Sequence, residues 1–177
     1  RVSSVRRRRN ILTGRVTTSI RSGTTPIPDF DRAVSLSGVL VSGNADAVYV
    51  LWEDGMFVRF DTRDLRQPSV AERGDLVRES TAQLTVARFL LGRDTLLIGD
   101  SEGRGSTWFR VRKEGATTPD GLTLTGAHVF SGPEAVTSIA SSSRKRMIAV
   151  GYGDGSVRIF YVTSDAFLAE ARPFSGS

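Results

Sequence analysis

The stretch from Arg144 to Asp165, Arg-Lys-Arg-Met-Ile-Ala-Val-Gly-Tyr-Gly-Asp-Gly-Ser-Val-Arg-Ile-Phe-Tyr-Val-Thr-Ser-Asp, decides the fold class. Two apolar runs flank a Gly-Asp-Gly turn, and turns of this kind favour a tight β-hairpin. Moving outward along the chain, the same strand, turn and strand plan occurs twice more. Its turn glycines, Gly55, Gly103 and Gly155, are 48 and 52 residues apart, a period in the range of propeller blades.

Each repeat predicts three consecutive strands, and two repeats are followed by a candidate for a fourth, outer strand. The expected first three strands of the repeats are Val34 to Val41, Ala47 to Trp52 and Met56 to Asp61; Leu84 to Leu91, Thr95 to Gly99 and Ser106 to Arg112; and Ala135 to Ala140, Arg146 to Gly151 and Ser156 to Val162. The expected outer strands are Val70 to Arg78 and Leu122 to Phe130. No stretch of ten or more residues keeps a helical period, so little helix is expected.

The predicted fold class is all-β, a β-propeller-like array of about three four-stranded blades. Closed propellers have about four to eight blades, so three repeats predict an incomplete, open arc. Residues 34–177 form the expected repeat domain, whereas residues 1–33 are a basic segment with one candidate strand, Asn10 to Ile20, and a Pro/Gly connector, Ser22 to Asp29. Arg1 to Arg9 are expected to be mobile or weakly attached.

An arginine follows each glycine turn between two apolar neighbours, at Arg59, Arg110 and Arg158. Successive side chains of a strand point to opposite faces. These strands are therefore expected to have one buried face and one that is less buried, which carries the arginine. The large aromatic side chains, Trp52, Trp108, Phe109 and Phe160, are expected in the core rather than on a base-stacking surface.

The net charge of +5 is concentrated at the N-terminus. Residues 1–9 contain five arginines and no acid, which leaves 19 basic and 19 acidic residues in the rest of the chain. A neutral body does not indicate nucleic-acid binding, and the run Arg6 to Arg9 is either a solvated segment or a contact for anionic lipid headgroups or an acidic partner. No apolar run approaches the roughly 18 to 20 residues of a membrane span, so any spans of the parent protein lie outside this piece.

Enzyme-like motifs are present, but their context predicts turns. Gly99 to Gly103 fits the Gly-x-Ser-x-Gly nucleophile elbow, and Asp120 and His128 follow in hydrolase order. That elbow requires a helix directly after Ser101, whereas a strand is predicted there. With no cysteine and a single histidine, we expect no catalytic residue, no metal site and no cofactor.

The third repeat resembles a WD-repeat blade. The resemblance rests on His128, on Val136 to Ala140, on Ile148 to Gly151 and on Asp154 to Phe160. In that family a histidine before the inner strand, an aspartate in the tight turn and a tryptophan on the third strand form a buried polar network. His128 and Asp154 match the first two, whereas Phe160 stands where the tryptophan would be.

A narrower resemblance lies in residues 90–103 with Trp108 to Arg112, together with Val50 to Gly55. These segments look like the extramembrane domain of some proteobacterial phosphate ABC transporter permease subunits. The resemblance implies a periplasmic, non-catalytic accessory or sensory domain of an inner-membrane protein. Its implied partners are other domains or subunits of the transporter and a soluble substrate-binding protein. The alternatives are a general WD-repeat-like protein-binding scaffold, a basic nucleic-acid-binding module and a hydrolase.

Four basic residues on predicted turns are the candidate contacts for an anion or a partner: Arg93, Arg144, Lys145 and Arg146. Guanidinium groups match phosphate oxygens well. No helix N-terminus or glycine nest is predicted near them to add converging backbone donors. We therefore expect inorganic phosphate to bind no more tightly than about millimolar, and any functional contact to be made with a protein or membrane surface.

Overall fold

The structure, a computed structural model, describes residues 2–9, 13, 16–27, 33–77, 81–90, 95–142, 144–164 and 166–172. These residues form strands and no helix, so no helix long and apolar enough to cross a membrane occurs among them. In chain order the strands are β1 (Val2–Arg9), β2 (Val16–Gly23), β3 (Leu36–Val41), β4 (Ala47–Trp52), β5 (Met56–Asp61), β6 (Ser69–Asp75), β7 (Leu84–Phe89), β8 (Leu96–Asp100), β9 (Arg104–Arg112), β10 (Leu122–Ser131), β11 (Val136–Ser141), β12 (Met147–Tyr152), β13 (Val157–Tyr161) and β14 (Ala166–Ala171).

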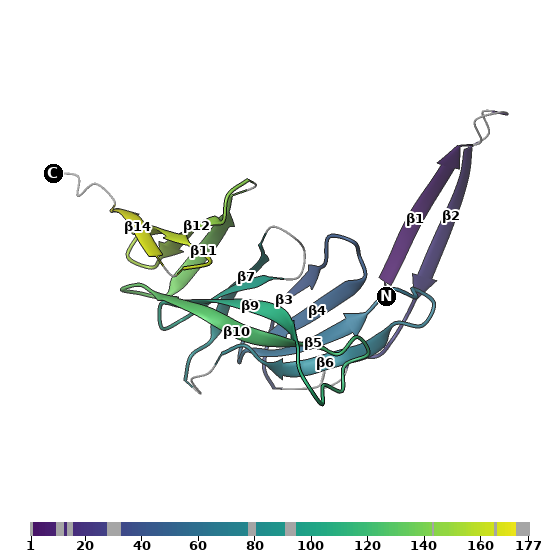
Figure 1. Ribbon diagram of the computed structural model, residues 1–177, viewed down its shortest axis with the longest axis horizontal. Helices are drawn as coiled ribbons and strands as arrows, with labels where there is room; N and C mark the ends of the chain where they lie inside the picture. The colour runs from purple at the N-terminus through teal and green to yellow at the C-terminus, as the bar shows by residue number, and fades with distance from the viewer. Residues whose placement is uncertain are drawn as a thin grey trace.

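Twelve of the strands form three antiparallel sheets of four, each in simple sequence order. We call these sheets blade 1 (β3 to β6), blade 2 (β7 to β10) and blade 3 (β11 to β14). They follow one another in an arc that does not close, while the two-stranded sheet β1–β2 projects from the end next to blade 1 (Figure 1). The expectation of about three four-stranded blades in an open array is confirmed.

The repeated acid and glycine residues form the turn between the second and third strands of each blade. Gly55, Gly103 and Gly155 have φ of 88°, 78° and 81°, a left-handed conformation that favours glycine. In the third turn, for example, Asp154 Oδ1 accepts a hydrogen bond of 2.9 Å from the Ser156 N–H. The glycine supplies the conformation and the aspartate satisfies a turn donor, which explains why this pair marks each repeat.

Two parts of the chain differ from the sequence prediction. The strand β14, Ala166–Ala171, was not expected, and it completes blade 3. Near the N-terminus, Val2–Arg9 pairs with Val16–Gly23 as a hairpin, in place of one strand at Asn10 to Ile20 after a loosely attached tail. Asn10 to Leu12 lie outside the described residues.

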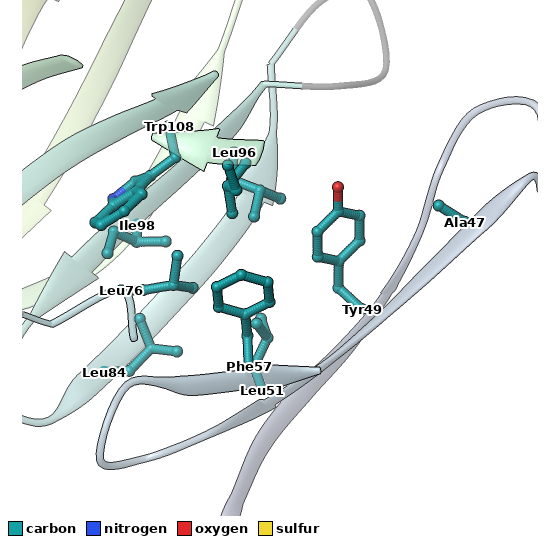
Figure 2. Packing of buried hydrophobic residues seen from close by; sticks show 10 residues of the cluster. Ala47, Tyr49, Leu51, Phe57, Leu76, Leu84, Leu96, Ile98 and Trp108 are labelled. Carbon is teal, nitrogen blue, oxygen red and sulfur yellow. The ribbon is translucent and has the colours of Figure 1, made fainter. Parts of the chain in front are cut away.

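The blades pack face to face, and the apolar core lies between them. Figure 2 shows the cluster between blades 1 and 2, where Tyr49 and Phe57 of blade 1 meet Leu96 and Trp108 of blade 2. A second cluster joins blades 2 and 3, with Phe130 stacked on Phe160 at a centroid distance of 5.0 Å. Burying one such large apolar side chain contributes about 1.5 to 3 kcal/mol, so the contacts between blades stabilise the array.

The prediction of one buried and one less buried face is wrong for the middle strands of blade 1. Every side chain of β4 is buried, and Arg59 in the middle of β5 is only 4% exposed. Blade 2 covers one face of this sheet, while Ile27, Val34 and Met56 pack against the cluster on its other face. Trp52, Trp108 and Phe160 are buried, as expected of core residues, whereas Phe109 is only partly buried.

Candidate functional site

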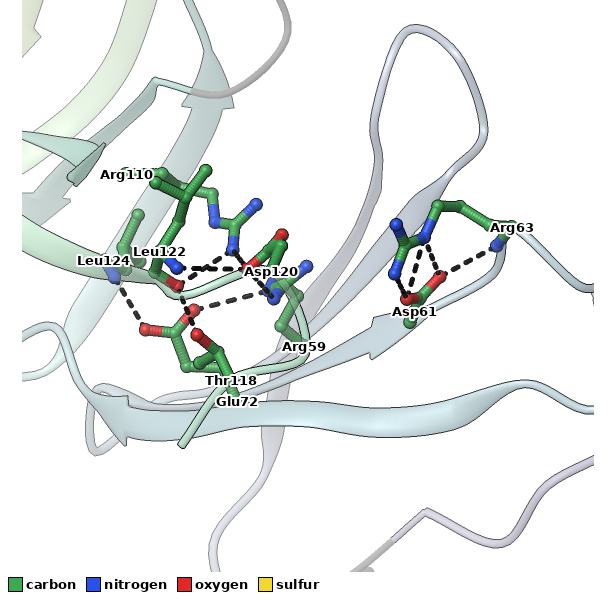
Figure 3. Close-up of polar contacts among 9 residues, drawn as sticks. All are labelled: Arg59, Asp61, Arg63, Glu72, Arg110, Thr118, Asp120, Leu122 and Leu124. Atoms are coloured by element: carbon green, nitrogen blue, oxygen red, sulfur yellow. Dashed lines mark hydrogen bonds and ion pairs between the residues drawn. The ribbon is translucent and has the colours of Figure 1, made fainter. Parts of the chain in front are cut away.

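The two most deeply buried charged side chains among the described ion pairs, those of Arg59 and Glu72, lie between blades 1 and 2 (Figure 3). Arg59 on β5 lies opposite Glu72 on β6, and their side chains are 4% and 5% exposed. Arg110 on β9 and Asp120, which precedes β10, complete this group from blade 2. We call these four residues the interblade charge cluster.

Glu72 connects the two blades directly. Its Oε2 accepts a hydrogen bond of 3.3 Å from Arg59 Nε within blade 1. Its Oε1 accepts a hydrogen bond of 2.6 Å from the Leu124 N–H on β10 of blade 2. A buried carboxylate is tolerated only when it is paired and hydrogen-bonded, and Glu72 meets both conditions by spanning the interface.

Asp120 holds the blade 2 side of the cluster. Arg110 Nη2 donates to Asp120 Oδ1 at 2.7 Å and to the Leu122 carbonyl at 2.9 Å, while Arg59 Nη2 lies 3.7 Å from the same Oδ1. The hydrogen bond from Arg110 lowers the pKa of Asp120 to about 2, although partial burial opposes this shift. Asp120 is therefore ionised at neutral pH and is unsuited to proton transfer, which needs a pKa near the working pH.

A hollow of about 140 Å³ lies beside the cluster. Its lining residues are Asp46, Ala47, Arg59, Asp61, Arg63, Arg110 and Asp120. Three guanidinium groups face three carboxylates there, so the hollow has no charge excess to attract an anion or a cation. We interpret the cluster as a polar clamp that fixes the relative position of blades 1 and 2.

The low pKa of Asp120 predicts that the free energy of unfolding decreases at acidic pH. Because the pKa is lower in the folded chain than the ordinary 3.8, ionised Asp120 stabilises the fold above about pH 4, and this contribution is lost as the pH falls toward about 2. Asp120→Asn should remove about 1 to 2 kcal/mol at pH 7 and flatten the pH dependence in that window. Urea unfolding between pH 2 and 7 measures this. Asp64→Asn, on an exposed loop, is the control, and equal pH profiles for the two variants would refute the assignment.

The candidate contact residues Arg144, Lys145 and Arg146 lie together on the exposed turn between β11 and β12. Ser142 Oγ accepts hydrogen bonds from the backbone N–H groups of Arg144 at 3.3 Å and of Lys145 at 3.1 Å, which fixes the turn. Within the described residues no salt bridge neutralises these three side chains. Arg93 lies outside the described residues.

Ser101 lies in a hairpin turn, as predicted. Its Oγ accepts a hydrogen bond of 2.9 Å from the Gln83 N–H, and strand β9 begins at Arg104, where a nucleophile elbow would have a helix. Asp120, the acid of the hydrolase-like order, is bound to Arg110. The geometry gives Ser101 a structural role in the turn.

The buried polar network implied by the WD-repeat resemblance does not form at Asp154. Asp154 is exposed, and its Oδ1 accepts hydrogen bonds from the N–H and Oγ of Ser156 in its own turn. His128 lies on the outer strand β10 of blade 2, with its ring edge-on to Phe109 at 6.1 Å. The two residues that match the family pattern, His128 and Asp154, therefore lie in different blades and make separate contacts.

The interblade charge cluster was missed in the sequence. The three arginines that follow the glycine turns are not equivalent in register: Arg59 lies opposite Glu72, Arg110 opposite Leu124, and Arg158 opposite Glu170. The available signal was a pair of opposite charges, Arg59 and Glu72, on two neighbouring apolar strands.

Comparison with known proteins supports the fold and nothing finer. No family model and no curated protein sequence matches the chain. Among solved structures, the crystal structure of RRP9 WD40 repeats matches 81% of the chain with a TM-score of 0.62 and 12% identity. The structure of U3-55K matches 81%, and the Myceliophteria thermophila Cps50 (Swd1) β-propeller domain matches 88%, both with a TM-score of 0.62 and 12% identity.

The chain spans 40 to 50% of the length of these solved chains. At 12% identity the likeness shows the fold alone. The chain therefore has a WD-repeat-like β-propeller fold of three blades.

Proposed function

We propose that this chain is a non-catalytic protein-interaction scaffold whose contact surface includes the basic turn Arg144, Lys145 and Arg146. The observation that carries the proposal is that three exposed cations share one turn, fixed by Ser142, without a salt bridge from the described residues. An exposed cluster of one charge sign favours a partner surface of the opposite sign. Acidic protein surfaces fit this chemistry, because no helix N-terminus in the described chain adds backbone donors for a small anion.

The basic turn can be tested with a photo-reactive amino acid placed at Lys145 in the cells that produce the protein. We expect a cross-link to a protein with an acidic surface, and we expect Arg144→Glu with Arg146→Glu to abolish it. Arg66→Glu, an exposed arginine on the loop between β5 and β6, is the matched control and should leave the cross-link intact. A cross-link that survives reversal of both charges would contradict the proposal.

A direct phosphate site is the competing explanation of the same residues. Titration calorimetry with inorganic phosphate should show binding no tighter than about millimolar. A saturable micromolar site that Arg146→Ala removes would instead make the chain a phosphate sensor.

A finer proposal assigns the scaffold to a phosphate ABC transporter permease, with the domain on the periplasmic side of a bacterial inner membrane. It rests on the sequence resemblance in residues 50–55, 90–103 and 108–112, and the solved propellers lend it no support. Its partners would be other transporter subunits or a soluble substrate-binding protein. The test is the genomic neighbourhood: a membrane domain in the same reading frame and an adjacent ATPase gene are expected, and their absence would reject this assignment.

A further inference from the structure

Blade 3 has one face that the described chain leaves uncovered. The register of its strands places small or apolar side chains together on this face: Ser138, Ala140, Met147, Ala149, Gly151, Val157, Ile159, Tyr161, Ala166, Ala169 and Ala171. None of these residues is charged, and none is buried. Val157 and Tyr161 are 39% and 38% exposed. Contiguous exposed apolar surface on a soluble domain marks an interaction site.

The same face is buried in the other two blades. In blade 1, Leu51 and Phe57 are 1% and 3% exposed beneath blade 2. In blade 2, the corresponding positions Gly99 and Gly105 are buried, and a Cβ on Gly99 would lie 2.4 Å from Val136 Cγ1 of blade 3. Gly151 occupies this position in blade 3, where the Ser138 Oγ of its own blade would lie 2.5 Å from a Cβ on Gly151. In blade 2, Val86 of the same blade lies close to Gly99 in this way, and Val136 of the following blade packs beside it.

A hydrogen bond that is repeated between neighbouring blades also runs from the inner strand of one blade to the blade that follows. Each inner strand has a register irregularity near its start, at Ser37, Thr85 and Thr137. Thr85 Oγ1 lies 3.0 Å from the Gly99 carbonyl of its own blade and 2.6 Å from the Val136 carbonyl of the next blade. Ser37 Oγ likewise donates to the Leu84 carbonyl of the next blade at 3.4 Å. Thr137 Oγ1 makes the own-blade bond, to the Gly151 carbonyl at 3.1 Å, and no following blade in the described chain offers it a carbonyl.

At the opposite end of the array, the outward face of blade 1 is covered. The face of blade 1 that points away from blade 2 is buried, with Trp52 and Val58 at 1% and 0% exposure, and Ile27 and Val34 pack against it. Repeat arrays need their end faces covered, and among the described residues only the first end face is covered. A second copy of the chain could not offer its blade 1 in the same way, because that face already carries the connector.

We propose that the open face of blade 3 docks a further four-stranded blade of the same type, which continues the interface already repeated between blades 1, 2 and 3. The partner blade begins its inner strand with an apolar side chain that packs over Gly151 beside Ser138, as Val136 packs over Gly99 beside Val86. The backbone carbonyl of that same residue shares the single hydroxyl proton of Thr137 with the Gly151 carbonyl, in the three-centre arrangement that Thr85 shows between its two carbonyls. Leu36-Ser37, Leu84-Thr85 and Val136-Thr137 give the sequence signature of such a start, an apolar residue followed by a hydroxyl residue.

The test appends a probe blade, a second copy of residues 132–172, to the C-terminus of the full chain. We expect the chain alone to be monomeric and to bind the hydrophobic dye ANS. We expect the longer chain to unfold at a higher urea concentration, whereas its dye fluorescence should persist, because the appended blade ends the array with the same open face. Ile159→Arg in the original blade 3 should abolish this gain in stability, whereas Thr163→Arg, on an exposed turn of the same blade, should preserve it.

A copy of blade 2, residues 80–132, is appended in the same way as a second probe, because the copy of blade 3 alone could fail to fit the open face. If neither appended blade raises the unfolding midpoint, the proposal fails. A chain that binds no dye as a monomer also overturns it. A stable dimer that Ile159→Arg dissociates would show that a second copy covers the face, which equally overturns the proposal.

Discussion

Glu72→Ala is expected to lower the free energy of unfolding by about 3 to 5 kcal/mol, the usual cost of removing one partner from a buried ion pair. The substitution leaves the Arg59 guanidinium, only 4% exposed, with no carboxylate closer than Asp120 at 3.7 Å, and it removes the acceptor of the buried Leu124 N–H. Urea unfolding of the purified variant measures the loss. Glu72→Gln, which keeps an acceptor but no charge, should fall between the wild type and Glu72→Ala.

Glu170→Ala is the matched control for this prediction. Glu170 lies opposite Arg158 on the same pair of strands in blade 3, but this pair is more exposed, at 22% and 19%. Its loss should be much smaller, because solvent screens exposed pairs. The double variant Arg59→Met with Glu72→Leu should recover part of the lost stability, since apolar replacements of buried ion pairs are often tolerated. Equal losses for Glu72→Ala and Glu170→Ala would contradict the description of the interblade charge cluster.

Phe130→Ala is expected to cost about 3 to 5 kcal/mol, because it opens a cavity between blades 2 and 3. Phe130 is 4% exposed, stacks on Phe160 at 5.0 Å and lies over Gly105, where a Cβ would clash with its ring. Chemical denaturation again gives the magnitude. The cavity should also weaken the docking of blade 3, so amide exchange in β12 should become faster.

Phe167→Ala provides the control for the cavity. Phe167 also contacts Phe160, at 5.9 Å, but its side chain is 54% exposed on the outer strand of blade 3. Its removal should cost less than about 1 kcal/mol, because little apolar surface returns to water. If both phenylalanine variants lose the same stability, the packing between blades 2 and 3 is not as described.

The repeat plan could be predicted from the sequence because turn chemistry is local. Gly55, Gly103 and Gly155 adopt the positive φ that their acid and glycine turns require, so the hairpins around them were placed correctly. The strand Ala166–Ala171 was missed because its alanines, leucine and glutamate are good helix formers and no glycine turn precedes it. Pairing with β13 overrides that intrinsic preference.

The interblade charge cluster could not be predicted because it depends on what covers each sheet. Strand periodicity predicts that Arg59 lies on the less buried face of β5. In the structure Arg59 lies directly opposite Tyr49, so their side chains share one face of the sheet. The periodicity does not reveal that blade 2 packs against this face and contributes Asp120 and Leu124 from a distant part of the chain. The basic turn, in contrast, was predictable, because its residues are adjacent in the sequence.

The central claim is that the three repeats stack face to face as blades, and a nuclear Overhauser measurement between Gly99 and Val136 tests it most directly. Val136 Cγ1 would lie 2.4 Å from a Cβ on Gly99, so the account predicts a strong cross-peak between the Gly99 α protons and the Val136 methyl groups. These residues belong to different sheets, and hydrogen bonding within either sheet does not bring them together. A folded chain with no such cross-peak, or with Val136 in contact only with its own blade, would contradict the account.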